Sequence, residues 1–198
     1  MEELRHHYQV IDTMLTMHSA LRDRYQRRAL LVDLVLLCSS VILCAAVFID
    51  PDVLKSLNID PQMSRIAIGI CSILVFLISV MELRVDWKEK AERHSQANEA
   101  LGRLKAECRE LLKSEDQPDS QRIKEQCRAC AWVLNSLPKI PEAEFHRLKA
   151  LHKRKIELSK MIGTYPGSSL FMLRLILWFR ATRDLLRAQM VSNREGEE

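Results

Sequence analysis

Cysteine and histidine residues in the second half of the chain come closest to the spacing of a chemical site. Cys127 and Cys130 form a Cys-x-x-Cys pair, and His146 and His152 follow, which is the ligand order of some zinc sites. The two histidines are six residues apart on an expected helix, so they point about 120° away from one another, whereas a helical ligand pair needs a spacing of three or four. We therefore expect no metal and no other cofactor.

Recognisable catalytic motifs are missing as well. The chain has no Gly-rich phosphate loop, no Gly-x-Ser-x-Gly elbow and no His-Glu-x-x-His pair, and its five glycines are too few to build such turns. Its net charge of +4 and 28% charged residues look like those of an ordinary soluble domain. We expect a protein that is not an enzyme and does not bind nucleic acid directly.

Two apolar stretches determine how the rest of the sequence is interpreted. Ala29–Ile49 has 21 residues with one charge, Asp33, and Ile66–Met81 has 16 uncharged residues. A helix needs about 20 residues to cross a bilayer, so the second stretch spans fully only if its flanking side chains reach the headgroups. A buried helix pair is the alternative, but apolar residues cover every face of both segments. The sequence predicts an all-α membrane protein with a two-transmembrane hairpin at residues 29–81.

The distribution of basic residues predicts the orientation. Four arginines precede the first span and four basic residues follow the second, whereas the connection holds only Lys55 and Arg65. By the positive-inside rule, both termini face the cytoplasm. The first span serves as the targeting signal, since no cleavable signal peptide precedes it. The residues expected at the membrane interface are Arg27, Arg28, Arg84, Trp87 and Trp178.

The segments outside the hairpin have helical patterns. Residues 1–28 predict a cytoplasmic amphipathic helix, whose apolar stripe packs on later helices or lies on the bilayer, and whose His6, His7 and His18 are solvated. Residues 82–190 predict a helical stalk and bundle, in which an apolar seam extends the second span as far as Lys113, about 70 Å if unbroken. The seam residues are Leu83, Trp87, His94, Leu101, Leu104, Cys108 and Leu111.

Proline and glycine residues divide the remainder of that region. Helices are expected from Asp119 or Ser120 to Leu134, from Pro141 to Ile162, and from Leu170 to Met190, followed by a disordered tail at residues 191–198. The last helix combines Trp178 with several arginines, which fits an interfacial helix on anionic lipid and equally a packed helix of a soluble bundle.

Small polar residues form a stripe along each span. Asp33, Ser40 and Cys44 share a face of the first, and Ser72 and Ser79 share a face of the second with Gly69 and Phe76. Such stripes serve close helix packing, and they also line narrow pores when several hairpins assemble. For Asp33, the alternatives are a pore-facing carboxylate and a shallow ion pair with Arg28 or Arg84.

Several landmarks after the spans match a known pattern. They are Glu82-Leu-Arg-Val-Asp-Trp87, the stalk with His94, Leu137-Pro-Lys-Ile-Pro141, Leu148-Lys-Ala-Leu-His152-Lys-Arg-Lys155 and Tyr165-Pro-Gly167. In this order the chain resembles the SLATT family, two-transmembrane proteins of bacterial conflict systems. The resemblance implies an effector in anti-phage defence that assembles and permeabilises the inner membrane, causing death or dormancy of an infected cell when a cytoplasmic partner detects a nucleotide signal.

The expected function is therefore that of an oligomeric, pore-forming membrane effector. One hairpin cannot enclose a channel, so several copies are needed, with Asp33, Ser40, Cys44, Ser72 and Ser79 as the pore-lining candidates. The cytoplasmic half lacks the alternation of strands and helices of a nucleotide-binding fold. If the resemblance holds, the trigger therefore comes from a separate sensor or nucleotide-signalling protein, or from the basic cytoplasmic bundle itself. The alternative is a non-conducting membrane anchor or adaptor that presents a cytoplasmic helical platform to a partner protein.

Overall fold

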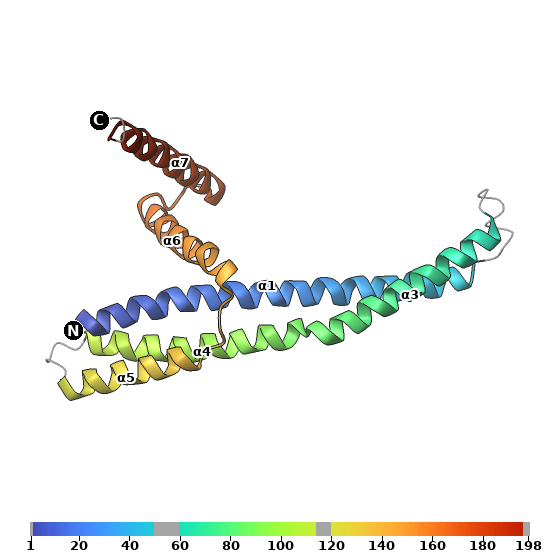
Figure 1. Ribbon diagram of the computed structural model, residues 1–198, viewed down its shortest axis with the longest axis horizontal. Helices are drawn as coiled ribbons and strands as arrows, with labels where there is room; N and C mark the ends of the chain where they lie inside the picture. The colour runs from blue at the N-terminus through green and yellow to red at the C-terminus, as the bar shows by residue number, and fades with distance from the viewer. Residues whose placement is uncertain (1, 50–59, 114–119, 196–198) are drawn as a thin grey trace. The chain divides into compact units, whose positions relative to one another are not determined.

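The computed structural model describes residues 2–49, 60–113 and 120–195, and within these ranges it is helical with no strand. The all-helical prediction is confirmed. The helices are α1 (Glu2–Val47), α3 (Pro61–Val85), α4 (Trp87–Lys113), α5 (Ser120–Ser136), α6 (Glu142–Thr164) and α7 (Leu170–Glu195) (Figure 1). The chain divides into two compact units, Met1–Lys139 and Ile140–Glu198. This boundary falls inside residues 82–190, which the sequence treats as one region.

Helix α1 joins the expected N-terminal helix and the first apolar stretch in one continuous helix (Figure 1). Neither glycine nor proline occurs in it, and the arginines and the glutamine of the basic run from Arg22 to Arg28 are good helix formers. Its contacts with α4 pair Asp12 with Lys105, His18 with His94 and Asp33 with Lys88, so the two helices are antiparallel. The polar and the apolar part of α1 are therefore mechanically one element.

The expected continuous helix from the second span to Lys113 is interrupted at a single residue, Asp86. Its backbone is left-handed (φ 47°, ψ 62°), which separates α3 from α4. Hydrogen bonding is nearly preserved, because the Asp86 N–H donates to the Glu82 carbonyl at 3.1 Å and the Lys90 N–H donates to the Asp86 carbonyl at 3.2 Å. The Asp86 carboxylate also accepts the Glu89 N–H at 3.0 Å, so one residue caps both helices.

Because of this interruption, the prediction for one residue of the seam, Leu83, is wrong. His94, Leu101, Leu104 and Cys108 are buried as expected, but Leu83 is 87% exposed. In an unbroken helix Leu83 would lie one turn before Trp87 on the same face. The left-handed Asp86 between them changes the register, so the seam of α4 does not continue back into α3.

The core of the first unit lies between α1, α4 and α5. Its spacing on α1 is seven residues, from Leu4 through Ile11 to His18, and on α4 it is also seven, from His94 through Leu101 to Cys108. A repeat of seven is that of a coiled-coil seam, in which each side chain packs between residues of the facing helix. Helix α5 closes this core with the buried side chains of Cys127 and Cys130.

The second unit is a pair of helices, α6 and α7, that contact one another. Leu148 and His152 of α6 and Leu173 of α7 are buried. Helix α6 begins after Pro141, whose carbonyl accepts the N–H groups of Glu144 and Phe145. Helix α7 extends to Glu195, into the segment 191–198 for which the sequence predicts a disordered tail; residues 196–198 lie outside the described ranges.

Candidate functional site

The apolar surface of α1 and α3 is the feature of this chain that needs an explanation. The most apolar 18-residue window of each helix contains no buried residue. Exposed side chains include Leu37 (65%), Ile42 (66%), Ile73 (62%) and Phe76 (67%). The core helix of a soluble protein would bury such a window, because exposed apolar surface on this scale is unfavourable in water. Both helices are long and apolar enough to span a membrane.

Within this apolar region, α1 and α3 contact each other along a narrow seam. The half-buried positions on α1 follow one another in alternating steps of four and three residues, and those on α3 are seven residues apart. They are Val32, Leu36, Ser39, Leu43 and Ala46 on α1 and Ile68 and Val75 on α3. Val32 and Ser39 continue the series of Leu4, Ile11, His18 and Tyr25 in steps of seven. One seam thus runs through both parts of α1.

The five pore-lining candidates all lie outside this seam. Asp33, Ser40, Cys44, Ser72 and Ser79 are exposed in the chain, so none of them is used to close the hairpin. At about 100° per residue, the polar stripe of α1 is turned from the seam by about 100°, and Ser72 and Ser79 of the α3 stripe by about 40°, both in the direction of increasing residue number. Because the two helices run in opposite directions, the same sense of rotation brings both stripes to one side of the hairpin.

Asp33 forms an ion pair where the apolar region meets the core. The Lys88 ammonium group donates to Asp33 Oδ1 at 3.0 Å and lies 2.9 Å from Oδ2, and it is 4.0 Å from a Glu82 carboxylate oxygen. The expected ion pair is present, but its expected partners, Arg28 and Arg84, are wrong. The register of α1 against α4 decides this, since it brings Lys88 opposite Asp33 from 55 residues away. Both side chains remain about half exposed or more.

A buried histidine pair, His18 and His94, lies further into the core, six residues beyond Lys88 on α4. The Nδ1 atoms of His18 and His94 are 2.8 Å apart, so one ring donates and the other accepts. The Tyr25 ring stacks on His94 with the ring centres 5.7 Å apart and an angle of 7° between the planes. The prediction that His18 is solvated is wrong, because only 1% of it is exposed. His18 occupies the seam position after Leu4 and Ile11.

This environment favours neutral rings. Burial, and to a smaller extent the neighbouring His94, lowers the pKa of His18 from 6.5 to about 4. Burial also lowers the pKa of His94. A hydrogen bond between two Nδ1 atoms needs one protonated and one unprotonated nitrogen, so charging both rings breaks it. The pair therefore holds α1 to α4 only while at least one ring stays neutral.

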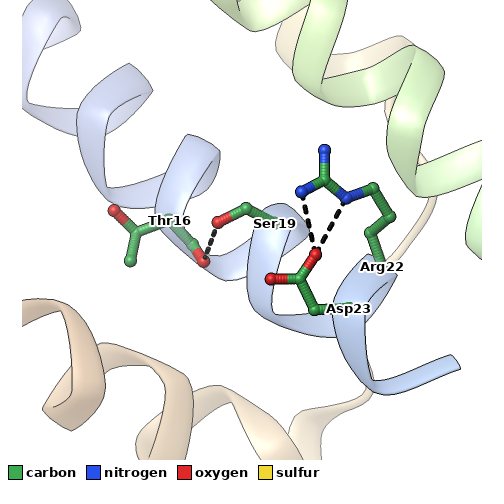
Figure 2. Close-up of polar contacts among 4 residues, drawn as sticks. All are labelled: Thr16, Ser19, Arg22 and Asp23. Atoms are coloured by element: carbon green, nitrogen blue, oxygen red, sulfur yellow. Dashed lines mark hydrogen bonds and ion pairs between the residues drawn. The ribbon is translucent and has the colours of Figure 1, made fainter. Parts of the chain in front are cut away.

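Polar side chains on α1 near this point make contacts within their own helix. The Ser19 hydroxyl donates to the Thr16 carbonyl at 2.9 Å, and the Arg22 guanidinium donates to Asp23 Oδ1 from Nε at 3.0 Å and from Nη2 at 2.8 Å (Figure 2). Arg22 is the first of the basic run before the apolar part. Two residues of that run which the sequence places at a membrane interface, Arg27 and Arg28, are exposed, as is Arg84, while Trp87 is half buried.

The two cysteines and two histidines whose order in the sequence resembles a zinc site do not belong to the same unit. Cys127 and Cys130 belong to the first unit, whereas His146 and His152 belong to the second. The Cys130 thiol lies 3.6 Å from that of Cys108 on α4, and both are buried. Burial, with the contact to Cys108, raises the pKa of Cys130 to about 12, which keeps it a thiol.

Helix α7 carries a second exposed apolar surface. Phe171 (72% exposed), Trp178 (60%) and Phe179 (59%) lie on it, while Leu173 is buried. The Trp178 and Phe179 rings meet edge to face, with their centres 4.9 Å apart. The exposed side chains of Arg180 and Arg183 follow on the same helix. Most of the apolar surface of α7 is thus not used within the described chain.

The comparisons with known proteins give no relative from which a function can be carried over. No protein-family model, no curated protein and no solved structure matches this chain.

Proposed function

We propose that this protein is an oligomeric membrane effector that permeabilises the bacterial inner membrane. The observation that carries the proposal is the placement of the five pore-lining candidates, from Asp33 to Ser79, which all lie on the same side of the seam shared by two exposed apolar helices. A hairpin that served only as an anchor needs no such side. No residue is assigned a catalytic role.

The proposed topology follows from the charges beside the two spans. Arg27, Arg28 and Arg84 lie where the apolar helices meet the core, and by the positive-inside rule they support a cytoplasmic position for the core of α1, α4 and α5. Both termini are then cytoplasmic. The ion pair of Asp33 with Lys88 lies at the same boundary, which lowers the cost of a carboxylate at the edge of the bilayer.

Permeation requires several copies of the hairpin. A pair of helices encloses no lumen, but a ring of hairpins that turn their polar sides to a common axis lines a path with hydroxyl, thiol and carboxylate groups. The opposite side of each hairpin, which includes Leu31, Ile42, Leu74 and Ile78, then faces lipid. This division of the surface is what a lipid-embedded oligomer requires.

Control from the cytoplasm is part of the proposal. Helix α1 connects core to span without a break, so a rotation of the core turns the polar side toward or away from the axis. The resemblance to the SLATT family adds that the trigger comes from a cytoplasmic partner or a nucleotide signal in anti-phage defence. In this proposal, the continuous helix α1 transmits the rotation from the core to the span.

The test is membrane depolarisation, read with a voltage-sensitive dye in a bacterial host at matched membrane levels. Ser40→Leu with Ser72→Leu adds apolar bulk to the polar side, and Cys38→Leu with Cys71→Leu adds it on the other side of the seam. We expect depolarisation by the wild type and by the cysteine variant, and its loss in the serine variant. Equal depolarisation by both variants excludes the polar side as the path.

A second candidate function is a non-conducting adaptor, and the surface of α7 favours it. Phe171, Trp178 and Phe179 are exposed beside basic residues, as on a platform that binds another protein or the membrane surface. Replacing residues 29–81 with an unrelated hairpin of equal length distinguishes the two functions. An adaptor keeps its cellular effect after the exchange, whereas a pore loses it.

A further inference from the structure

Three potential metal ligands meet where the start of α1 lies against α5. They are a carboxylate oxygen of Glu3, a ring nitrogen of His7 and the sulfur of Cys127, and all three atoms lie within 4.8 Å of one another. We propose that these three side chains bind a zinc ion. This inference does not depend on the proposed membrane function.

The backbone presents these ligands in a way that suits a metal. Glu3 and His7 are four residues apart on α1, so they lie on one face one turn apart, which is the spacing of ligand pairs on helices. Cys127 approaches from α5, 120 residues later in the sequence. Ligands that come from two elements fix a metal more rigidly than ligands from a single turn.

The three ligand atoms would have to move slightly closer together to bind zinc. Zinc binds sulfur at about 2.3 Å and nitrogen or oxygen at about 2.0–2.2 Å, so in a tetrahedral site the ligand atoms are about 3.3–3.8 Å from one another. The present limit of 4.8 Å exceeds this by about 1 Å. Glu3 is exposed and His7 half exposed, so rotation of their side chains can supply the movement while Cys127 stays buried.

The choice of ligands also points to zinc. Thiolate, imidazole and carboxylate together suit zinc, whereas magnesium and calcium prefer oxygen alone. Burial, and then the negative charge of Glu3, raises the pKa of Cys127 in the absence of a metal. A bound zinc ion reverses both effects, because it neutralises the carboxylate and stabilises the thiolate, and the thiol proton is released to solvent. A water molecule would complete the tetrahedral coordination.

The neighbouring cysteines make Cys127 distinct. Cys130, the other member of the Cys-x-x-Cys pair, is 3.6 Å from Cys108 and completely buried in the core. Cys127 is at the edge of that core, with 8% of its surface exposed, on the side of α1. The usual interpretation of Cys-x-x-Cys as two ligands of one metal therefore does not apply, and a single cysteine joins the pair from α1.

Binding would fasten the first turn of α1 to α5. Helix α1 contacts α5, and the nearby core residue Leu4 is completely buried. A ligand that binds the folded core and not the unfolded chain stabilises the core in proportion to the logarithm of its concentration. We therefore expect zinc to raise the melting temperature of the first unit.

The experiment uses the full chain in detergent micelles, reduced with a phosphine and freed of metal with a chelator. Zinc is titrated and its content measured after gel filtration, and cobalt serves as a spectroscopic probe, since a thiolate ligand adds a sulfur-to-cobalt charge-transfer band. The ligand variants are Glu3→Gln, His7→Ala and Cys127→Ser. The matched controls are Glu2→Gln, His6→Ala and Cys38→Ser, each an exposed residue of the same type on α1.

We expect one zinc per chain in the wild type and the controls. Each ligand variant should lose more than about tenfold in affinity, because even an outer-shell partner of a metal contributes that much. Cys127→Ser should also lose the charge-transfer band. Absence of stoichiometric zinc, or equal affinity of His6→Ala and His7→Ala, overturns the proposal. Glu3 and His7 lie at the surface, so their variants fold and the test stands even if Cys127→Ser does not fold.

Discussion

The two parts of α1 solve the same packing problem in different surroundings. From Leu4 to Tyr25 the helix packs on α4 and α5 through a seam of seven-residue spacing, and its other faces are polar. From Ala29 to Val47 the same seam continues against α3, but the surface outside the seam is exposed and, apart from the polar side of Asp33, Ser40 and Cys44, apolar. The seam has the same spacing in both parts, and only the outer surface differs. Only the outer surface therefore distinguishes a helix that packs in water from one suited to lipid.

Truncating the seam in the first part has the largest expected effect. Leu101→Ala removes a completely buried side chain that faces α1, and such a change costs about 2–5 kcal/mol of unfolding free energy. Leu31→Ala, at an exposed position in the second part, should cost about 0.5 kcal/mol or less. Urea unfolding in micelles, followed by circular dichroism, measures both. Equal costs would show that the two parts do not differ as described.

A charge added to the outer surface should have a large effect in the second part of α1 and none in the first. Leu37→Arg places a guanidinium near the middle of the apolar part, which costs about 2.5–3.5 kcal/mol in membrane insertion. Gln9→Arg places the same group on an exposed position of the first part and should cost nothing measurable. The measurement is the fraction of protein that resists carbonate extraction from membranes. Full resistance of Leu37→Arg would contradict the proposed span.

Acid should weaken the first part of α1 and leave the second unchanged. Since the pKa of His18 is lower in the folded chain than its ordinary 6.5, the unfolded chain binds more protons between pH 6.5 and about 4. Stability is therefore complete above pH 6.5 and falls as the pH drops through that range, by at most about 1.4 kcal/mol per pH unit for one proton. His18→Leu should flatten the profile, and His6→Leu should not. Thermal melts across that range provide the test.

The ion pair at the junction should contribute least. Asp33 and Lys88 are 47% and 64% exposed, and exposed pairs change the folding equilibrium constant by only about 1.5-fold to 5-fold. Asp33→Asn, Lys88→Gln and the double variant form a cycle whose coupling energy is read from urea unfolding. The coupling should shrink as salt is raised. A coupling well above this range would mean that the pair lies in an environment of lower dielectric than its exposure indicates.

Local patterns predicted most of the helix boundaries. Proline and acidic residues around Pro141 predicted the start of α6, and the Tyr-Pro-Gly segment predicted its end. Asp86 left no comparable signal, because the usual helix breakers are glycine and proline. Aspartate tolerates the left-handed conformation and can cap a helix with its own side chain, so this interruption is visible only in the backbone.

Contacts between distant helices were the part that sequence could not supply. His18 and His94 are 76 residues apart, and their meeting depends on the register of α1 against α4. A seven-residue series through Leu4, Ile11 and Tyr25 was present in the sequence and would have placed His18 in the seam. The candidates Asp33, Ser40 and Cys44 were correctly grouped on one face, but which side of the hairpin that face occupies required the position of α3.

The continuity of α1 sets a rule for changes of chain length. One residue inserted after Gln26 would rotate everything beyond it by about 100° relative to the core, and Asp33 would lose its place opposite Lys88. Seven inserted residues would restore the face, because they complete about two turns. An insertion beside Asp86 would fall where the left-handed backbone of Asp86 already interrupts the helix. Insertions beside Asp86 should therefore be tolerated, whereas insertions in α1 after Gln26 should be tolerated only in multiples of seven residues.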